Sequence, residues 1–159
     1  MAVQVTRTNL FSESRTNVVD LITANVSDPI SGSSEYRKWV YSRYPDVKSN
    51  DFQGYPFIVL PETSLDNDDP ITLNQDFRNE SLDYEIEIYA DFNDESARVS
   101  TLGDEVVYAI LKSSNQDTLL SNGLAYPQVT SSPIEPVTIA NKKVTGRLIS
   151  ISFSFEVCF

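Results

Sequence analysis

Two segments of the chain alternate apolar and polar residues, which is the pattern of a β-strand with one buried face and one face in water. The first runs from Leu82 to Ala90, where Asp83, Glu85 and Glu87 occupy polar positions. The second runs from Arg147 to Phe159, with Ile, Phe and Val on one face and mainly Ser on the other. Because its β pattern is the most consistent in the chain, we expect this final strand to lie in the interior of a sheet.

Two other segments repeat apolar residues every three or four positions, as amphipathic helices do. The first spans residues 10–26 and should stop at Asp28-Pro29, since the residue before a proline avoids the helical region. The second spans Glu95 to Lys112, with Asp94 as its expected N-cap. Its predicted core-facing stripe is Val99, Leu102, Val106, Val107, Ile110 and Leu111. We expect it to pack on the sheet through Val99, Leu102, Val106 and Ile110. Gly103, on the same stripe, predicts the close approach of a neighbouring group.

The remaining segments give weaker signals. Phe57 to Leu60 reads as a short buried strand, and Glu35 to Tyr44 is compatible with a strand or a short helix. Glu62 to Pro70 is acidic and rich in turn-forming residues, which predicts a surface loop. Leu119 to Pro136 reads as irregular with one or two short strands, and Lys142-Lys143 as part of a turn. The order of elements predicts one α+β domain over residues 1–159, a mainly antiparallel sheet with two amphipathic helices packed on one face.

Composition narrows the possible partners. Twelve basic and 23 acidic residues give a formal charge of −11, which disfavours tight binding to nucleic acid or to an anionic membrane. Met1 to Leu10 has no signal-peptide core, and no run reaches the length of a membrane span. We therefore expect a soluble, unprocessed protein made in the cytoplasm. Cys158 is the only cysteine, so no disulfide can form within the chain.

The usual catalytic groups are scarce. The chain has no histidine, which removes the commonest general base and metal ligand and excludes Ser-His and Cys-His nucleophilic pairs. One cysteine cannot build a thiolate zinc site, and the five glycines form no phosphate-binding loop. The sequence therefore predicts a protein that is not an enzyme and that has no catalytic residues, metal or cofactor.

Two clusters have a functional and a structural interpretation. The carboxylates of Asp83, Glu85 and Glu87 could hold a divalent cation or serve a hydrolase, but a solvated strand face explains them more simply. The same holds for the acids between Asp66 and Asp69, which lack the glycine and distal glutamate of a calcium loop. We expect neither cluster to be catalytic.

An aromatic cluster could form a stacking platform for a base or a sugar, although packing in the core and at the sheet edge is favoured. Its members are Tyr36, Trp39, Tyr41 and Tyr44. The neighbouring basic residues, including Arg37 and Arg43, more often pair with surplus acids than with a ligand.

The layout as a whole resembles a known family. A helix leads to Pro56 to Pro61 (Pro-Phe-Ile-Val-Leu-Pro), then to the acidic-aromatic strand Asp83 to Tyr89, the helix Glu95 to Lys112 and the alternating strand Leu148 to Val157. This order is similar to that of the tail terminator, or tail completion, proteins of long-tailed phages of the lambda type.

The resemblance implies a structural virion protein without catalytic activity. Such proteins form a hexameric ring that caps the tail tube, stops its polymerisation and offers an interface to the head connector. DNA only passes through the lumen, and no membrane is involved. The expected location is the head–tail junction of a virion, after synthesis in the host cytoplasm.

If the chain is a terminator, exposed loops rather than the core must carry recognition. The candidate partner-binding residues are Glu62, Asp66, Asp68 and Asp69. The candidate subunit-interface residues are Arg37, Arg43 and Arg147. Leu124 to Asn141 is a second candidate contact segment.

Other functions remain open. Within the same virion, the chain could be a head-completion or neck protein, or a tail-tube subunit, which a long, strongly paired hairpin in the middle of the chain would favour. Outside a virion, it could be a small binding module for a ligand or peptide, or a carboxylate-dependent enzyme.

Overall fold

The chain folds into one sheet with helices packed against it, which confirms the α+β prediction. The computed structural model describes residues 10–30, 37–61, 63–70, 77–94 and 96–158, and the side chains of 12–30, 37–61, 81–93 and 98–154. The elements in chain order are α1 (Leu10–Asn25), β1 (Val40–Tyr41), β2 (Phe57–Val59), β3 (Thr63–Pro70), β4 (Phe77–Asp91), a 3₁₀ turn (Phe92–Asp94), α2 (Ser96–Leu111), α3 (Ser113–Ser121), β5 (Ala125–Ile139) and β6 (Lys142–Cys158).

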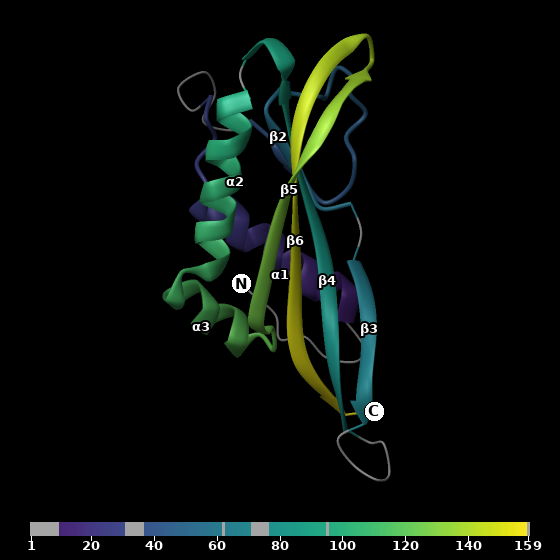
Figure 1. Ribbon diagram of the computed structural model, residues 1–159, viewed down its shortest axis with the longest axis vertical. Coiled ribbons are helices and arrows are strands. Elements are labelled where there is room, and N and C mark those ends of the chain that lie inside the picture. The colour runs from purple at the N-terminus through teal and green to yellow at the C-terminus, as the bar shows by residue number, and fades with distance from the viewer. Residues whose placement is uncertain (1–9, 31–36, 62, 71–76, 95, 159) are drawn as a thin grey trace.

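The long strands β4 and β6 form the centre of the sheet (Figure 1). The strand order is β1-β2-β4-β6-β5, and β3 pairs with a different part of β4 from β2. β6 is antiparallel to β4 over the whole of β4, from Phe77 opposite Cys158 to Asp91 opposite Val144. The prediction that the final strand lies inside the sheet is therefore confirmed, and only the β1–β2 pairing is parallel among the described strands.

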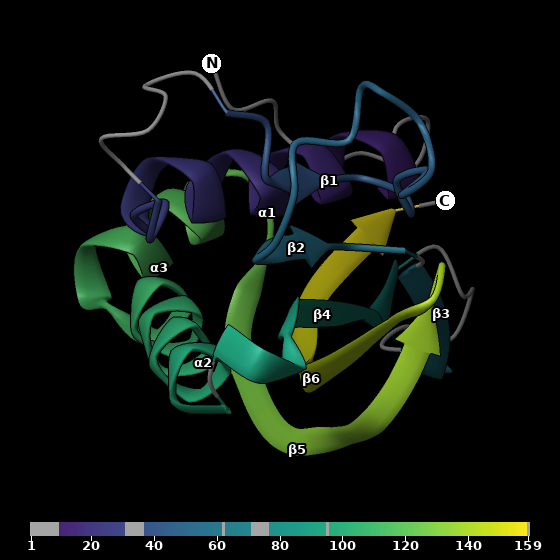
Figure 2. The same cartoon turned by 90° about the horizontal axis from the view of Figure 1, so that it is seen from above.

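The main core lies between the helices and one face of this sheet (Figure 2). The predicted contact residues of α2, Val99, Leu102, Val106 and Ile110, are all buried. They join Val18, Ile22, Leu82, Tyr84, Ile86, Ile149, Ile151 and Phe153 in one cluster. Burial raises the pKa of the Tyr84 hydroxyl in this core to about 12. Both predicted helices therefore exist. The predicted stripe of α2 is buried or half-buried except for Leu111, which is 42% exposed because it lies at the end of the helix. α2 begins at Ser96, after a 3₁₀ turn that includes the expected N-cap Asp94.

A third helix was not predicted: α3 follows α2 after the single residue Lys112. It ends at a Schellman motif, in which the Leu124 amide donates to the Leu119 carbonyl and the Gly123 amide donates to the Leu120 carbonyl. Gly123 has φ of 91°, the left-handed conformation that this motif requires. Leu119 and Leu124 are both buried, which supplies the apolar contact that accompanies such an end.

The segment expected to be irregular is instead the long strand β5. It pairs with β6 and joins it through a two-residue turn at Ala140 and Asn141, both with positive φ, as a type I′ hairpin requires. Lys142 and Lys143, expected in the turn, are the first residues of β6. β5 is an edge strand interrupted by Pro127, Pro133 and Pro136, with irregular register near the first and last of these.

One further expectation is wrong, and one open alternative is decided. The acidic segment Thr63–Pro70 is not a loop but the strand β3, because it finds hydrogen-bonding partners along β4. Among the described residues 37–44, Val40–Tyr41 is the only regular segment, and it is a strand, which is the first of the two alternatives that the sequence left open. In the part of the chain that the structure describes, no helix is both long enough and apolar enough to span a membrane.

The packing of α2 makes a direct prediction. Val106 is fully buried against the sheet, so Val106→Asp would place an unpaired charge in the core and lower the free energy of unfolding by about 4 kcal/mol or more. Ser100→Asp, on the exposed side of the same helix, should change it by less than about 0.5 kcal/mol. Urea unfolding followed by circular dichroism measures both. Equal stability of the two variants would show that the buried face of α2 is assigned wrongly.

Candidate functional site

The helix-free face of the sheet is the main candidate for function. Its side chains alternate along the strands with those of the core and therefore point away from the helices. Asp83, Glu85 and Glu87 all lie on this face of β4, and they are part-exposed or exposed. Opposite them β6 places Ser152, Ser150 and Leu148, and β5 continues the rows with Gln128, Thr130 and Ser132. Among the described side chains of these rows none is basic, so the surface carries carboxylates, hydroxyls and an amide.

The end of this face next to β2 is covered by a second, aromatic cluster. Tyr41, Phe57 and Val59 are buried there, and Phe52, Tyr55 and Tyr89 pack around them. The ring of Phe57 lies 5.4–5.9 Å, between centroids, from the rings of its four aromatic neighbours, within the range of favourable ring pairs. The loop between β1 and β2 is thereby held on the sheet.

The stacking-platform interpretation of the 36–44 aromatics is not supported by this arrangement. Trp39 is buried in the main core, whereas Tyr41, two residues later, is buried in the aromatic cluster. Tyr44 is 55% exposed and Tyr36 lies outside the described residues. The favoured prediction of core and edge packing is confirmed for Trp39 and Tyr41.

Glu87 ties this loop to the sheet. Its Oε2 accepts hydrogen bonds from the hydroxyl of Tyr44, at 2.7 Å, and from the hydroxyl of Tyr89, at 2.6 Å. Burial and the bond to this carboxylate raise the pKa of the Tyr89 hydroxyl. One acid of the predicted carboxylate row therefore has a structural role, which sequence spacing alone did not indicate.

The described residues contain no group of three or more acids or cysteines placed to hold a metal ion. Asp83 and Glu85 remain on the open part of the face, beside the Ser152 and Ser150 positions of β6. The arrangement offers an acidic, hydroxyl-rich surface.

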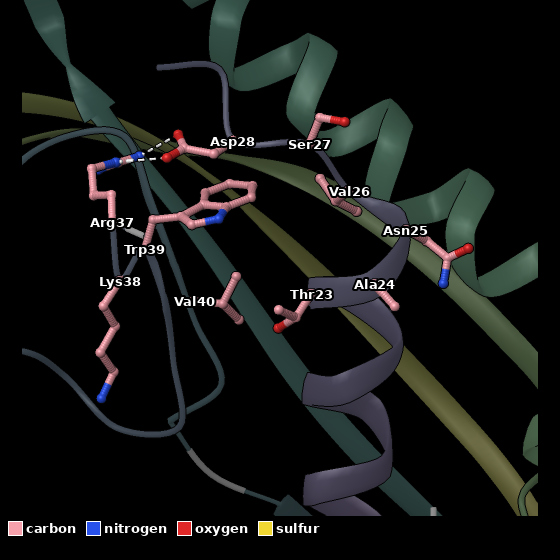
Figure 3. Close-up of a pocket in the computed structure, with 10 residues that line it drawn as sticks. All are labelled: Thr23, Ala24, Asn25, Val26, Ser27, Asp28, Arg37, Lys38, Trp39 and Val40. Carbon is pink, nitrogen blue, oxygen red and sulfur yellow. Dashed lines mark hydrogen bonds and ion pairs between the residues drawn. The ribbon is translucent and has the colours of Figure 1, made fainter. Parts of the chain in front are cut away.

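Arg37 lies inside the molecule, at a surface pocket of about 530 Å³ between the end of α1 and β1 (Figure 3). Its side chain is 4% exposed, and its guanidinium makes a bidentate ion pair with Asp28, with nitrogen–oxygen distances of 2.9 and 2.7 Å. It also donates to the carbonyls of Gly54 and Pro56. Burial of Asp28 raises the pKa of that carboxyl, but the hydrogen bonds and charge of Arg37 outweigh this effect, so its pKa lies below the usual 3.8.

The other two predicted interface arginines differ in exposure. Arg43 is exposed and lines a second pocket, of about 620 Å³, with Arg15 and Lys38. Arg147 lies under α2: a Cβ at Gly103 would stand 2.8 Å from its Cδ, so the glycine makes room for it. The Arg147 Nε also donates to the Ser131 hydroxyl at 2.7 Å. The group whose approach Gly103 predicted is therefore Arg147 itself.

The predicted partner-binding acids are not gathered into a described site. Asp66, Asp68 and Asp69 lie on the edge strand β3, where the structure describes the backbone but not the side chains, and Glu62 lies outside the described residues. Asp66 is opposite Ser81 of β4.

Two features of the site escaped sequence reasoning. The sequence indicates Asp28 only as part of a helix stop, because nothing in the local pattern shows that Arg37 is buried and needs a carboxylate partner. The aromatic cluster joins Tyr55 and Phe57 to Tyr89, more than thirty residues away along the chain, and only the β2–β4 register brings them together.

Comparison with models of known protein families gives no match, and no curated protein matches the chain. Function is therefore inferred from the residues and the fold.

The buried ion pair predicts a pH-dependent stability. Because the pKa of Asp28 is lowered in the folded state, its contribution is present above pH 3.8 and is lost as the pH falls through the lower, folded-state value. Asp28→Asn should lower the free energy of unfolding by about 3 kcal/mol at pH 7, since Arg37 would stay buried without its partner.

Urea unfolding between pH 7 and pH 3 tests this, with the exposed Asp117→Asn as the matched control. The difference between wild type and Asp28→Asn should shrink toward the acid end, whereas Asp117→Asn should match wild type throughout. A constant difference at every pH would contradict the role given to the carboxylate.

Proposed function

We propose that this chain is a non-enzymatic structural subunit of a phage tail, and specifically a tail terminator that forms a ring on the end of the tail tube. The observation that carries the proposal is the exposure of strand β5. It pairs with β6 along most of its length, yet none of its fifteen residues is buried.

An ordered strand of this kind contributes little to its own core. Strands in globular proteins have about five or six residues, and each residue that is fixed costs about 1–2 kcal/mol of conformational entropy. A fifteen-residue strand with both faces accessible is suited to burial against another subunit. It coincides with the Leu124 to Asn141 segment expected from the sequence to contact neighbours.

The helix-free face supports the same proposal. Asp83 and Glu85 give it negative charge, and the serine and threonine rows beside them are uncharged. In a ring, an acidic and hydroxyl-rich surface facing the lumen would repel DNA phosphates and so let DNA pass without being trapped. The head connector and the tail tube would contact the two ends of the ring.

A tail-tube subunit is the second candidate, and a specific observation favours it. The chain contains a hairpin in its middle, β3 with β4, as well as the β5–β6 hairpin. Paired ribbons of this length are what a polymerising tube subunit would use to contact its neighbours.

The terminator and the tail-tube subunit differ in where the chain lies in the virion and in how many copies are present. Particles should be labelled with gold-conjugated antibody against the chain and examined by electron microscopy. A terminator gives label only where tail meets head, with about six copies per particle, whereas a tube subunit gives label along the tail. Label at neither place would contradict both proposals.

The acidic strand β3 gives a further prediction within the terminator proposal. Changing Asp66, Asp68 and Asp69 together to Asn should leave the circular dichroism spectrum unchanged but reduce the fraction of tails joined to heads, because charged residues steer association. Asp117→Asn serves as the control. Normal tails, of normal length and fully joined, would exclude these three acids from the mechanism.

A further inference from the structure

The outward side of α2 carries an exposed stripe that nothing in the described fold covers. Tyr108 is 67% exposed and Leu111 is 42% exposed, and Asp104 and Lys112 lie beside them, also exposed. Figures 1 and 2 show α2 at the margin of the molecule, with the sheet on one side only. Large apolar side chains exposed together in this way mark interaction surfaces more often than isolated ones do.

The order of residues along the stripe is specific. Asp104, Tyr108 and Lys112 are spaced four residues apart, so they lie on one line along the helix. Lys112 is the N-cap of α3 and its ψ of 128° is extended, so the helix ends there. Its amide still donates to the Tyr108 carbonyl and its φ is −61°, and these two features fix the direction of its Cβ as in the helix, in register with the other two. The acid and the base stand about 12 Å apart with the tyrosine midway. Among the described residues, neither charge has an ion-pair partner.

The order acid, tyrosine, base along this helix is complementary to the same helix running in the opposite direction. If a second, identical helix lies antiparallel with its Tyr108 against the first Tyr108, then Asp104 of each copy faces Lys112 of the other. We propose that the outward face of α2 binds a second copy of this chain across a two-fold axis that passes near Tyr108. Both ion pairs and the tyrosine–leucine contacts form at once, because a two-fold interface uses the same surface twice.

The contact goes beyond the proposed ring and does not depend on it. Within a six-fold ring, each subunit presents one surface to its neighbour and a different one in return, so residue 108 never meets itself. A two-fold contact through α2 would join two separate rings, or two free chains. Its single pair of helices makes a small interface, and weak association is expected.

Disulfide trapping tests the geometry. In a Cys158→Ser background, Tyr108→Cys should give a cross-linked dimer under mild oxidation, because the axis brings position 108 against itself within disulfide reach. Ser100→Cys, on the same exposed helix, should not, since the two copies of that residue would be about 24 Å apart. Cross-linking at both positions or at neither would overturn the proposal.

Reversing the charges of Asp104 and Lys112 tests the specificity of the two-fold contact while Tyr108 stays unchanged. Sedimentation velocity of the full chain, up to about 1 mM, should show association that Asp104→Lys and Lys112→Asp each weaken about tenfold or more. The double variant, which restores opposite charges across the axis, should recover to within about threefold of wild type. A double variant as weak as the singles, or a wild type that shows no association through this face, would overturn the two-fold contact.

Discussion

The antiparallel pairing of β4 with β6 is the constraint on which the rest of the structure depends. Because side chains on a strand alternate between faces, one register places Ile86 and Ile149 under the helices and Glu85 and Ser150 on the opposite face. A shift of one residue would exchange these sets and put carboxylates into the core. The β2–β4 register likewise brings Phe57 against Tyr89 and so builds the aromatic cluster.

The two faces are held by different physical means. The helix-covered face is apolar and excludes polar groups apart from a few, such as Ser14 and Asn17 of α1. The other face combines ring packing with hydrogen bonds from Tyr44 and Tyr89 to Glu87. The loop between β1 and β2 is therefore fixed on the sheet although it contains almost no regular structure.

The sequence predicted the position of a helix or strand when that element is exposed on one side only. β4, β6 and α2 each have one buried and one wet face, and their periodicity gave their positions. β5 is accessible on both faces and contains three prolines, so it has no alternation to detect. α3 is short, and only Leu119 among its residues is buried, although the Asn122-Gly123 pair is a helix-end signal that could have been used. The Asp28–Arg37 pair and the Glu87–tyrosine bonds are tertiary, so spacing alone could not predict them.

The prolines of β5 have a consequence for a protein whose proposed role requires many copies in one cell. A long unpaired strand edge is a template on which other chains can add, and this is how ordered aggregates grow. Pro127, Pro133 and Pro136 have no amide hydrogen to donate to a strand on either side of β5, and the register is irregular near Pro127 and Pro136. The same exposed ribbon that is suited to contact a neighbour through its faces is thereby poorly suited to grow into a fibre through its edge.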